Sequence, residues 1–74
     1  DGRIIALSHL RVNESSLTGE HAAVSKEVKI LRGKMPLAEQ ENMVFRGTLV
    51  TRGSGEYVVT SIGLHTEIGK IAKL

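Results

Sequence analysis

Residues 13–20 hold the densest group of side chains that could do chemistry in this 74-residue chain. The segment carries two carboxylates, three hydroxyls and one glycine, and it follows a stretch that is typical of a β-strand. Glycine adopts backbone conformations that other residues avoid, so Gly19 would let the loop approach another surface closely and present the Glu20 carboxylate at its tip. The plainer interpretation is a polar surface loop with no chemistry of its own.

Two glycine-containing segments do not have the spacing of nucleotide-binding motifs. Residues 63–71 resemble a phosphate-binding loop, but five residues rather than four separate the two glycines, and Ile71 stands where Ser or Thr would hold magnesium. Residues 53–55 lack the third glycine and the following helix of a dinucleotide-binding fingerprint. The first segment is therefore predicted to be a capped helix, and the second a turn.

Metal-binding and hydrolytic sites are not indicated either. His9, His21 and His65 show no metal-ligand spacing and are expected to be surface or loop histidines. The chain has no cysteine and no Gly-x-Ser-x-Gly elbow, so neither a thiolate site nor a serine hydrolase is predicted.

The composition narrows the possible partners. Ten Lys and Arg against eight Asp and Glu give a net charge of +2, and one Tyr and one Phe are the only aromatic residues. This balance argues against nucleic acid, which needs a basic patch and aromatic side chains for base stacking. No apolar run approaches the roughly 20 residues of a membrane span. Because the chain does not begin with Met and its first residues already resemble a strand, we expect a piece of a longer protein.

The elements expected around the loop are mostly strands. Two short strands are predicted over residues 3–7 and 10–12. Two longer ones, rich in β-branched side chains, are predicted over residues 43–51 and 57–62. The glycines within residues 52–56 predict a hairpin turn between the longer strands, which would place this hairpin at the centre of the fold.

The remaining segments depart from the strand pattern. Residues 22–42 mix charged and aliphatic residues around Pro36, which predicts a surface excursion with at most short structure. A helix is predicted over residues 66–74 with Thr66 as its N-cap, and Gly69 inside it is unfavourable unless a close neighbour needs the space. The apolar stripe of this helix is expected to combine Leu64, Ile68, Ile71 and Ala72.

Four blocks of the chain, in the same order, resemble the actuator domain of P-type ATPases. Residues 12–20 (VNESSLTGE) resemble the signature V-D-E-S-x-L-T-G-E-S, and residues 1–4 (DGRI) resemble the end of a P-A-D-G-R-I strand. Residues 42–50 (NMVFRGTLV) are similar to the family's N-M-V-F-x-G-T-x-V strand, and residues 63–72 (GLHTEIGKIA) to a helix start. The sequences of residues 36–48 (PLAEQENMVFRGT) and 66–72 (TEIGKIA) are most similar to the calcium-pump-like subgroup.

The resemblance implies a partial actuator domain over residues 1–74. The implied fold is mainly β, a small distorted jelly-roll with the start of a helix at its C-terminal end. The implied parent protein is an ATP-driven ion pump that uses ATP and Mg²⁺, and this chain would be a cytoplasmic part of it, inactive alone. Its implied partners are the phosphorylation domain, the nucleotide-binding domain and the transmembrane helices of the same chain. No cofactor or metal is assigned to these 74 residues.

The resemblance also assigns roles within the loop. Glu20 would promote hydrolysis of an aspartyl-phosphate, and domain movement would couple this step to the membrane helices. A carboxylate held permanently beside the phosphoryl group would be repelled by about 4 kcal/mol at roughly 4 Å and an effective dielectric of about 20, which favours a mobile domain. Thr18 and Gly19 would assist Glu20, the former by bracing the loop or donating to phosphate. Loop support is expected from Glu14, Ser15, Ser16 and His21, with Glu14 in a structural or interdomain contact and the serines as capping hydroxyls.

Two positions depart from the family signature. Asn13 stands where Asp is usual, which removes a negative charge, and His21 stands where Ser is usual. An imidazole is bulkier than a hydroxyl and can carry charge near neutral pH. The alternative function is a non-catalytic β-rich interaction module that shares the fold. A D-K-T-G segment downstream, preceded by an apolar run of about 20 residues, would favour the pump.

Overall fold

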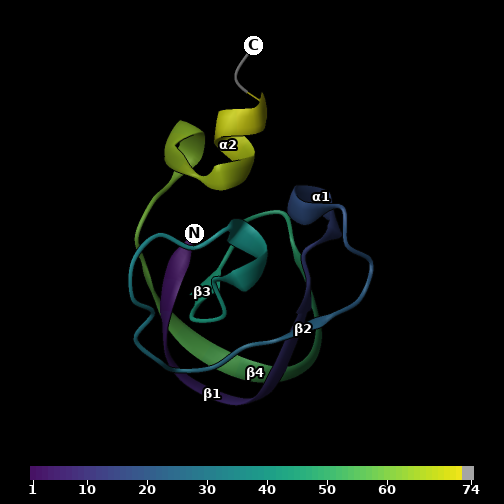
Figure 1. Cartoon of the computed structure of the whole chain (residues 1–74), viewed down its shortest axis with the longest axis vertical. Coiled ribbons are helices and arrows are strands. Elements are labelled where there is room, and N and C mark those ends of the chain that lie inside the picture. The colour runs from purple at the N-terminus through teal and green to yellow at the C-terminus, as the bar shows by residue number, and fades with distance from the viewer. Residues whose placement is uncertain (73–74) are drawn as a thin grey trace.

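β1 (Gly2–Asn13) is the central strand of the computed structural model, which describes residues 1–72. It pairs antiparallel with β2 (Val24–Ser25), β3 (Met43–Val44) and β4 (Leu49–Val59). Figure 1 shows β1 and β4 as two long curved ribbons that run side by side, with α1 and α2 toward the same end of the molecule. This arrangement confirms the predicted mainly β domain.

The two short strands predicted at the start of the chain form one continuous strand. His9 lies between them with a φ of 49°, and the pairing register with β4 shifts between Ser8 and Arg11. A bulge of this kind bends a strand without ending it. The sequence pattern therefore located the irregularity correctly but mistook it for a break.

The predicted central hairpin over residues 43–62 is wrong. Residues 52–56 continue β4 instead of reversing the chain, and β4 pairs with β1. Gly53 has a φ of 75°, and a Cβ there would collide with the backbone carbonyls of Ser8 and His9. The glycine thus serves a close approach between two bulged strands rather than a turn.

The core is small and lies on one face of β1. Ile4, Leu10 and Val12 are buried on this strand, and Phe45 is buried after β3. A groove of about 660 Å³, lined mainly by apolar side chains, opens beside them. β4 in contrast is exposed along its whole length.

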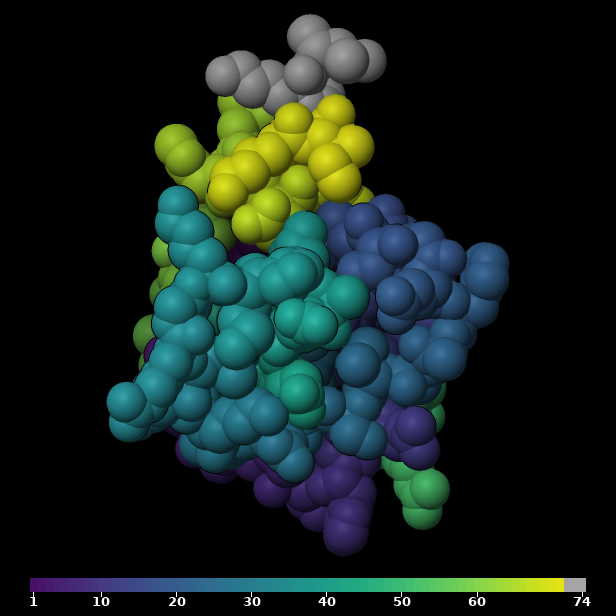
Figure 2. All heavy atoms as spheres, in the orientation of Figure 1, coloured from purple at the N-terminus to yellow at the C-terminus, as the bar shows by residue number. Residues whose placement is uncertain are grey.

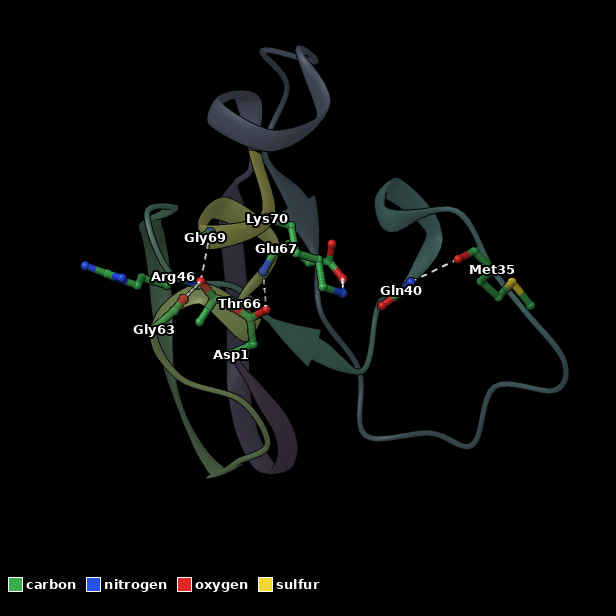
Figure 3. A network of polar contacts seen from close by, with 9 residues as sticks. All are labelled: Asp1, Met35, Gln40, Arg46, Gly63, Thr66, Glu67, Gly69 and Lys70. Carbon is green, nitrogen blue, oxygen red and sulfur yellow. Dashed lines mark hydrogen bonds and ion pairs between the residues drawn. The ribbon is translucent and has the colours of Figure 1, made fainter. Parts of the chain in front are cut away.

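α2 (Glu67–Ala72) begins where the sequence predicts, after the short 3₁₀ turn η2 (Gly63–His65). The Thr66 hydroxyl accepts a hydrogen bond from the Gly69 N–H at 3.0 Å, which confirms the predicted N-cap. The Asp1 carboxylate accepts a second bond, from the Glu67 N–H at 2.9 Å (Figure 3). The beginning of the chain therefore helps to hold the beginning of this helix.

The predicted apolar stripe of this helix is only partly buried. Leu64 and Ile71 are each 62% exposed, whereas Ile68 is half-buried. The last two residues of the predicted helix, Lys73 and Leu74, lie outside the described residues.

The surface excursion over residues 22–42 has short structure only, as predicted. It contains β2 and the 3₁₀ turn η1 (Leu37–Glu39), which begins directly after Pro36. The loop before it carries the short helix α1 (Ser15–Thr18). Within residues 1–72, no helix has the length and apolar character needed to cross a membrane.

Candidate functional site

The loop after β1 contains a helical turn, α1, where the sequence predicted an irregular loop. Gly19 ends this turn with a φ of 77° and a ψ of −4°, and its N–H donates to the Ser15 carbonyl at 2.9 Å. This is a left-handed helix cap, a conformation that glycine adopts without steric cost. A Cβ at position 19 would have no atom of the described chain within 4 Å, so only the backbone conformation demands glycine here.

The Thr18 hydroxyl lies inside the loop and makes two hydrogen bonds. It donates to the Glu14 carbonyl at 3.1 Å and accepts from the Glu20 N–H at 3.2 Å. Its proton is therefore directed into the loop. Both hydrogen bonds lie within the loop and hold its backbone.

Glu20 lies at the exposed apex of the loop. Its side chain is exposed, as are Gly19 and His21 on either side. Among the described residues, no hydrogen bond or ion pair engages its carboxylate. Figure 2 shows the blue segment that follows β1 as a projecting corner of the molecule. The carboxylate can therefore meet a group outside this chain.

Asn13 closes the base of the loop from both sides. Its Oδ1 accepts a hydrogen bond from the Ser15 N–H at 2.9 Å, and its Nδ2 donates to the His21 carbonyl at 3.1 Å. A carboxylate at this position could accept the first bond but could not donate the second. Sequence reasoning noted Asn13 only as a missing charge and did not predict this clamp.

Ser16 binds outside the loop rather than capping it locally. Its hydroxyl donates to the Gly47 carbonyl at 2.8 Å, in the connection between β3 and β4. Gly47 in turn lies against α2, because a Cβ there would come within 2.6 Å of Ile68 Cδ1. The loop, the β3–β4 connection and α2 thus meet at one end of the molecule (Figure 1).

Glu14 is buried at the start of the loop and forms an ion pair. Its Oε2 lies 2.6 Å from Lys26 Nζ, and each side chain is 1% exposed. Lys26 Nζ also donates to the Gln40 carbonyl at 3.3 Å and lies 5.4 Å from the centre of the Phe45 ring. Sequence reasoning placed Glu14 in a contact but missed Lys26, since no local spacing signals a pair that closes across a loop.

The described residues do not form a metal or nucleotide site. No three His, Asp or Glu side chains in residues 1–72 are grouped so that they could hold a metal ion. The segment that resembles a phosphate loop folds as η2 and α2, and its Thr66 hydroxyl is engaged as the helix cap.

Comparison with known proteins identifies the family. The family model for the P-type ATPase actuator domain matches residues 1–74. The chain is 45% identical over all its 74 residues to calcium-transporting ATPase 1 of Lactococcus lactis, and it covers 8% of that protein. It is 47% identical over 73 residues, 99% of the chain, to a probable cation-transporting P-type ATPase of Mycoplasma pneumoniae, again covering 8%.

A calcium-transporting ATPase of Listeria monocytogenes is 45% identical over the full chain, with 8% of that protein covered. The chain therefore spans about a twelfth of the length of these relatives. The match over every residue and the order of the motif blocks agree, and the chain belongs to the P-type ATPase actuator-domain family.

Proposed function

We propose that this chain is the actuator segment of a cation-transporting P-type ATPase and that Glu20 assists hydrolysis of its aspartyl-phosphate. The observation that carries this proposal is the Glu20 carboxylate, exposed and unpaired among the described residues, on a loop apex whose backbone is braced by Thr18. The names of the relatives, which describe calcium-transporting and cation-transporting ATPases, support the same class.

Glu20 would act on the second half of the phosphoryl-transfer cycle. A water oxygen attacks phosphorus, the bond between phosphorus and the aspartate oxygen breaks, and the Glu20 carboxylate accepts the proton that the water loses. The aspartate carboxylate is the leaving group, so atoms and charge balance. In this proposal, the ATP and Mg²⁺ that the family implies would be held by other parts of the parent chain.

The same arrangement suggests how hydrolysis couples to transport. The loop is tethered to Gly47 through Ser16, and Gly47 contacts Ile68 on α2. Movement of this segment as one body would bring Glu20 to the phosphorylation domain and displace both chain ends. In this proposal the chain is cytoplasmic, and its partners are the phosphorylation domain, the nucleotide-binding domain and the transmembrane helices of the same protein.

A chimera tests the proposal directly. In calcium-transporting ATPase 1 of Lactococcus lactis, the matching segment is replaced by these 74 residues, and phosphoenzyme formed from labelled ATP is followed during a chase. Glu20→Gln keeps the size of the side chain but removes the base, so we expect phosphoenzyme to form normally and to decay about 10²- to 10⁴-fold more slowly.

Glu56→Gln is the matched control, since Glu56 is also exposed but lies on β4, away from the loop. The phosphoenzyme of this variant should decay at the rate of the unmodified chimera. Unchanged decay in Glu20→Gln would remove this residue from the mechanism and leave the interaction module as the remaining interpretation.

A further inference from the structure

The buried ion pair between Glu14 and Lys26 lies directly beneath the loop that presents Glu20. Glu14 directly follows β1 and Lys26 directly follows β2, so the two side chains come from either side of this loop, and each is 1% exposed. We propose that this pair is a positioning device, which sets the place of Glu20 through Thr18. The inference rests on the function proposed above and adds two positioning residues to it.

The backbone of Glu14 is the link between the ion pair and the loop. Its carbonyl accepts hydrogen bonds from the Leu17 N–H and the Thr18 N–H, both at 2.9 Å, and from the Thr18 hydroxyl at 3.1 Å. The same hydroxyl accepts from the Glu20 N–H. A shift of Glu14 therefore moves Thr18, and a shift of Thr18 moves the backbone of Glu20.

Lys26 supplies the fixed point for this link. Its N–H donates to the Leu10 carbonyl at 2.9 Å, which ties it to the central strand beside the core. Its Nζ donates to the Gln40 carbonyl and lies over the Phe45 ring, so the ammonium is held from three directions. Through Lys26, Glu14 is thus anchored to the central strand.

A charged pair suits positioning better than an apolar contact at the same place. Glu14 Oε2 and Lys26 Nζ lie 2.6 Å apart as an ion pair, and neither carboxylate oxygen of Glu14 has a hydrogen-bond partner among the described residues. The attraction of Lys26 is therefore what holds this buried carboxylate in place. Burial protects this attraction from screening by salt. Apolar contacts are non-directional, so methionines could fill the same space without fixing the Glu14 backbone to the same degree.

The decisive variant replaces both partners at once in the Lactococcus chimera. Because a buried ion pair can be exchanged for apolar residues of similar volume without loss of folding, Glu14→Met with Lys26→Met separates position from stability. We expect phosphoenzyme to form from ATP at the unmodified rate and to decay about ten- to a hundredfold more slowly, as a misplaced catalytic group predicts. A second variant, Glu14→Asp, keeps both charges but shortens the arm by one methylene, and it should also slow decay selectively.

Lys29→Met with Glu41→Met is the matched control, since Lys29 and Glu41 form an ion pair at 3.2 Å with each side chain 36% exposed. Its decay should equal that of the unmodified chimera. Decay at the unmodified rate in both test variants, with Glu20→Gln still slow, would overturn the positioning role and leave the proposed function intact. Equal losses of phosphoenzyme formation and decay in both test variants would also overturn it, since the pair would then serve folding alone. Unchanged decay in Glu20→Gln would overturn both proposals.

Discussion

The side-chain amide of Asn13 donates a hydrogen bond to the carbonyl of His21 at 3.1 Å, across the base of the loop that carries Glu20. These are the two positions at which the chain departs from its family signature. The contact uses the His21 backbone, so the imidazole itself stays exposed. Asn13 contributes a donor that the usual Asp would lack.

Asn13→Asp is therefore expected to loosen the loop rather than to restore a better one. The carboxylate keeps the bond from the Ser15 N–H but faces the His21 carbonyl without a proton to share. Loss of one partly exposed hydrogen bond should lower the free energy of unfolding by about 0.5–1.5 kcal/mol, measured by urea denaturation of the chain. Asn13→Ser has a side chain too short to make either hydrogen bond, so it should lower the free energy of unfolding by at least as much. An equal or higher unfolding free energy in Asn13→Asp would contradict the clamp.

Gly19 offers a test of whether the loop closely approaches a partner. Within the described chain, position 19 has open space and only its left-handed backbone demands glycine. Asn tolerates this conformation better than Ala does. If only the backbone conformation mattered, the phosphoenzyme of Gly19→Asn would decay at the rate of the unmodified chimera, and that of Gly19→Ala would decay more slowly.

We expect instead that both Gly19 variants slow phosphoenzyme decay at least tenfold, because the added side chain meets the partner domain. The chase measurement on the chimera distinguishes the two cases. Decay at the unmodified rate in Gly19→Asn would show that no close approach occurs at this residue.

Gly69 should resist a substitution that usually stabilises helices. In most helices Gly→Ala gains about 1 kcal/mol. Here a Cβ would collide with the Gly63 carbonyl and lie 2.8 Å from Leu64 Cα, so Gly69→Ala should destabilise the chain by about 1–3 kcal/mol. Thermal unfolding measures the change. Gly33→Ala is the steric control. Position 33 has open space around a Cβ, so any destabilisation there comes from its positive φ alone.

The ion pairs of Lys29 should make the stability of the fold depend on pH in the alkaline range. A hydrogen bond from its ammonium to Glu41, and a second one to Glu27, raise the pKa of Lys29 above its ordinary value of 10.5. A raised pKa in the folded state stabilises the fold below pH 10.5 and loses this effect as the pH rises through the higher folded value. An NMR titration of the Lys29 side chain should show the raised midpoint, and Glu41→Gln should lower it toward 10.5. A midpoint at or below 10.5 in the unmodified chain would contradict the contact.

Local sequence signals predicted the elements that depend on neighbouring residues. The Thr66 cap, the short structure around Pro36 and the β-rich character of the chain all follow from propensities that act over a few residues. The motif blocks predicted the family for the same reason, because each is a short run of residues in a set order.

Only the tertiary structure decided which distant residues meet. In the structure, β4 pairs with β1 instead of forming a hairpin at Gly53. Glycine is needed there because a Cβ would collide with backbone carbonyls of β1, a contact that the local sequence does not reveal. The tertiary structure also joins Glu14 to Lys26, a pair whose geometry depends on how the intervening loop closes. Sequence alone determined which side chains are available for chemistry. Their positions are set by hydrogen bonds and charges between segments far apart in the chain, and these form only when the sheet has assembled.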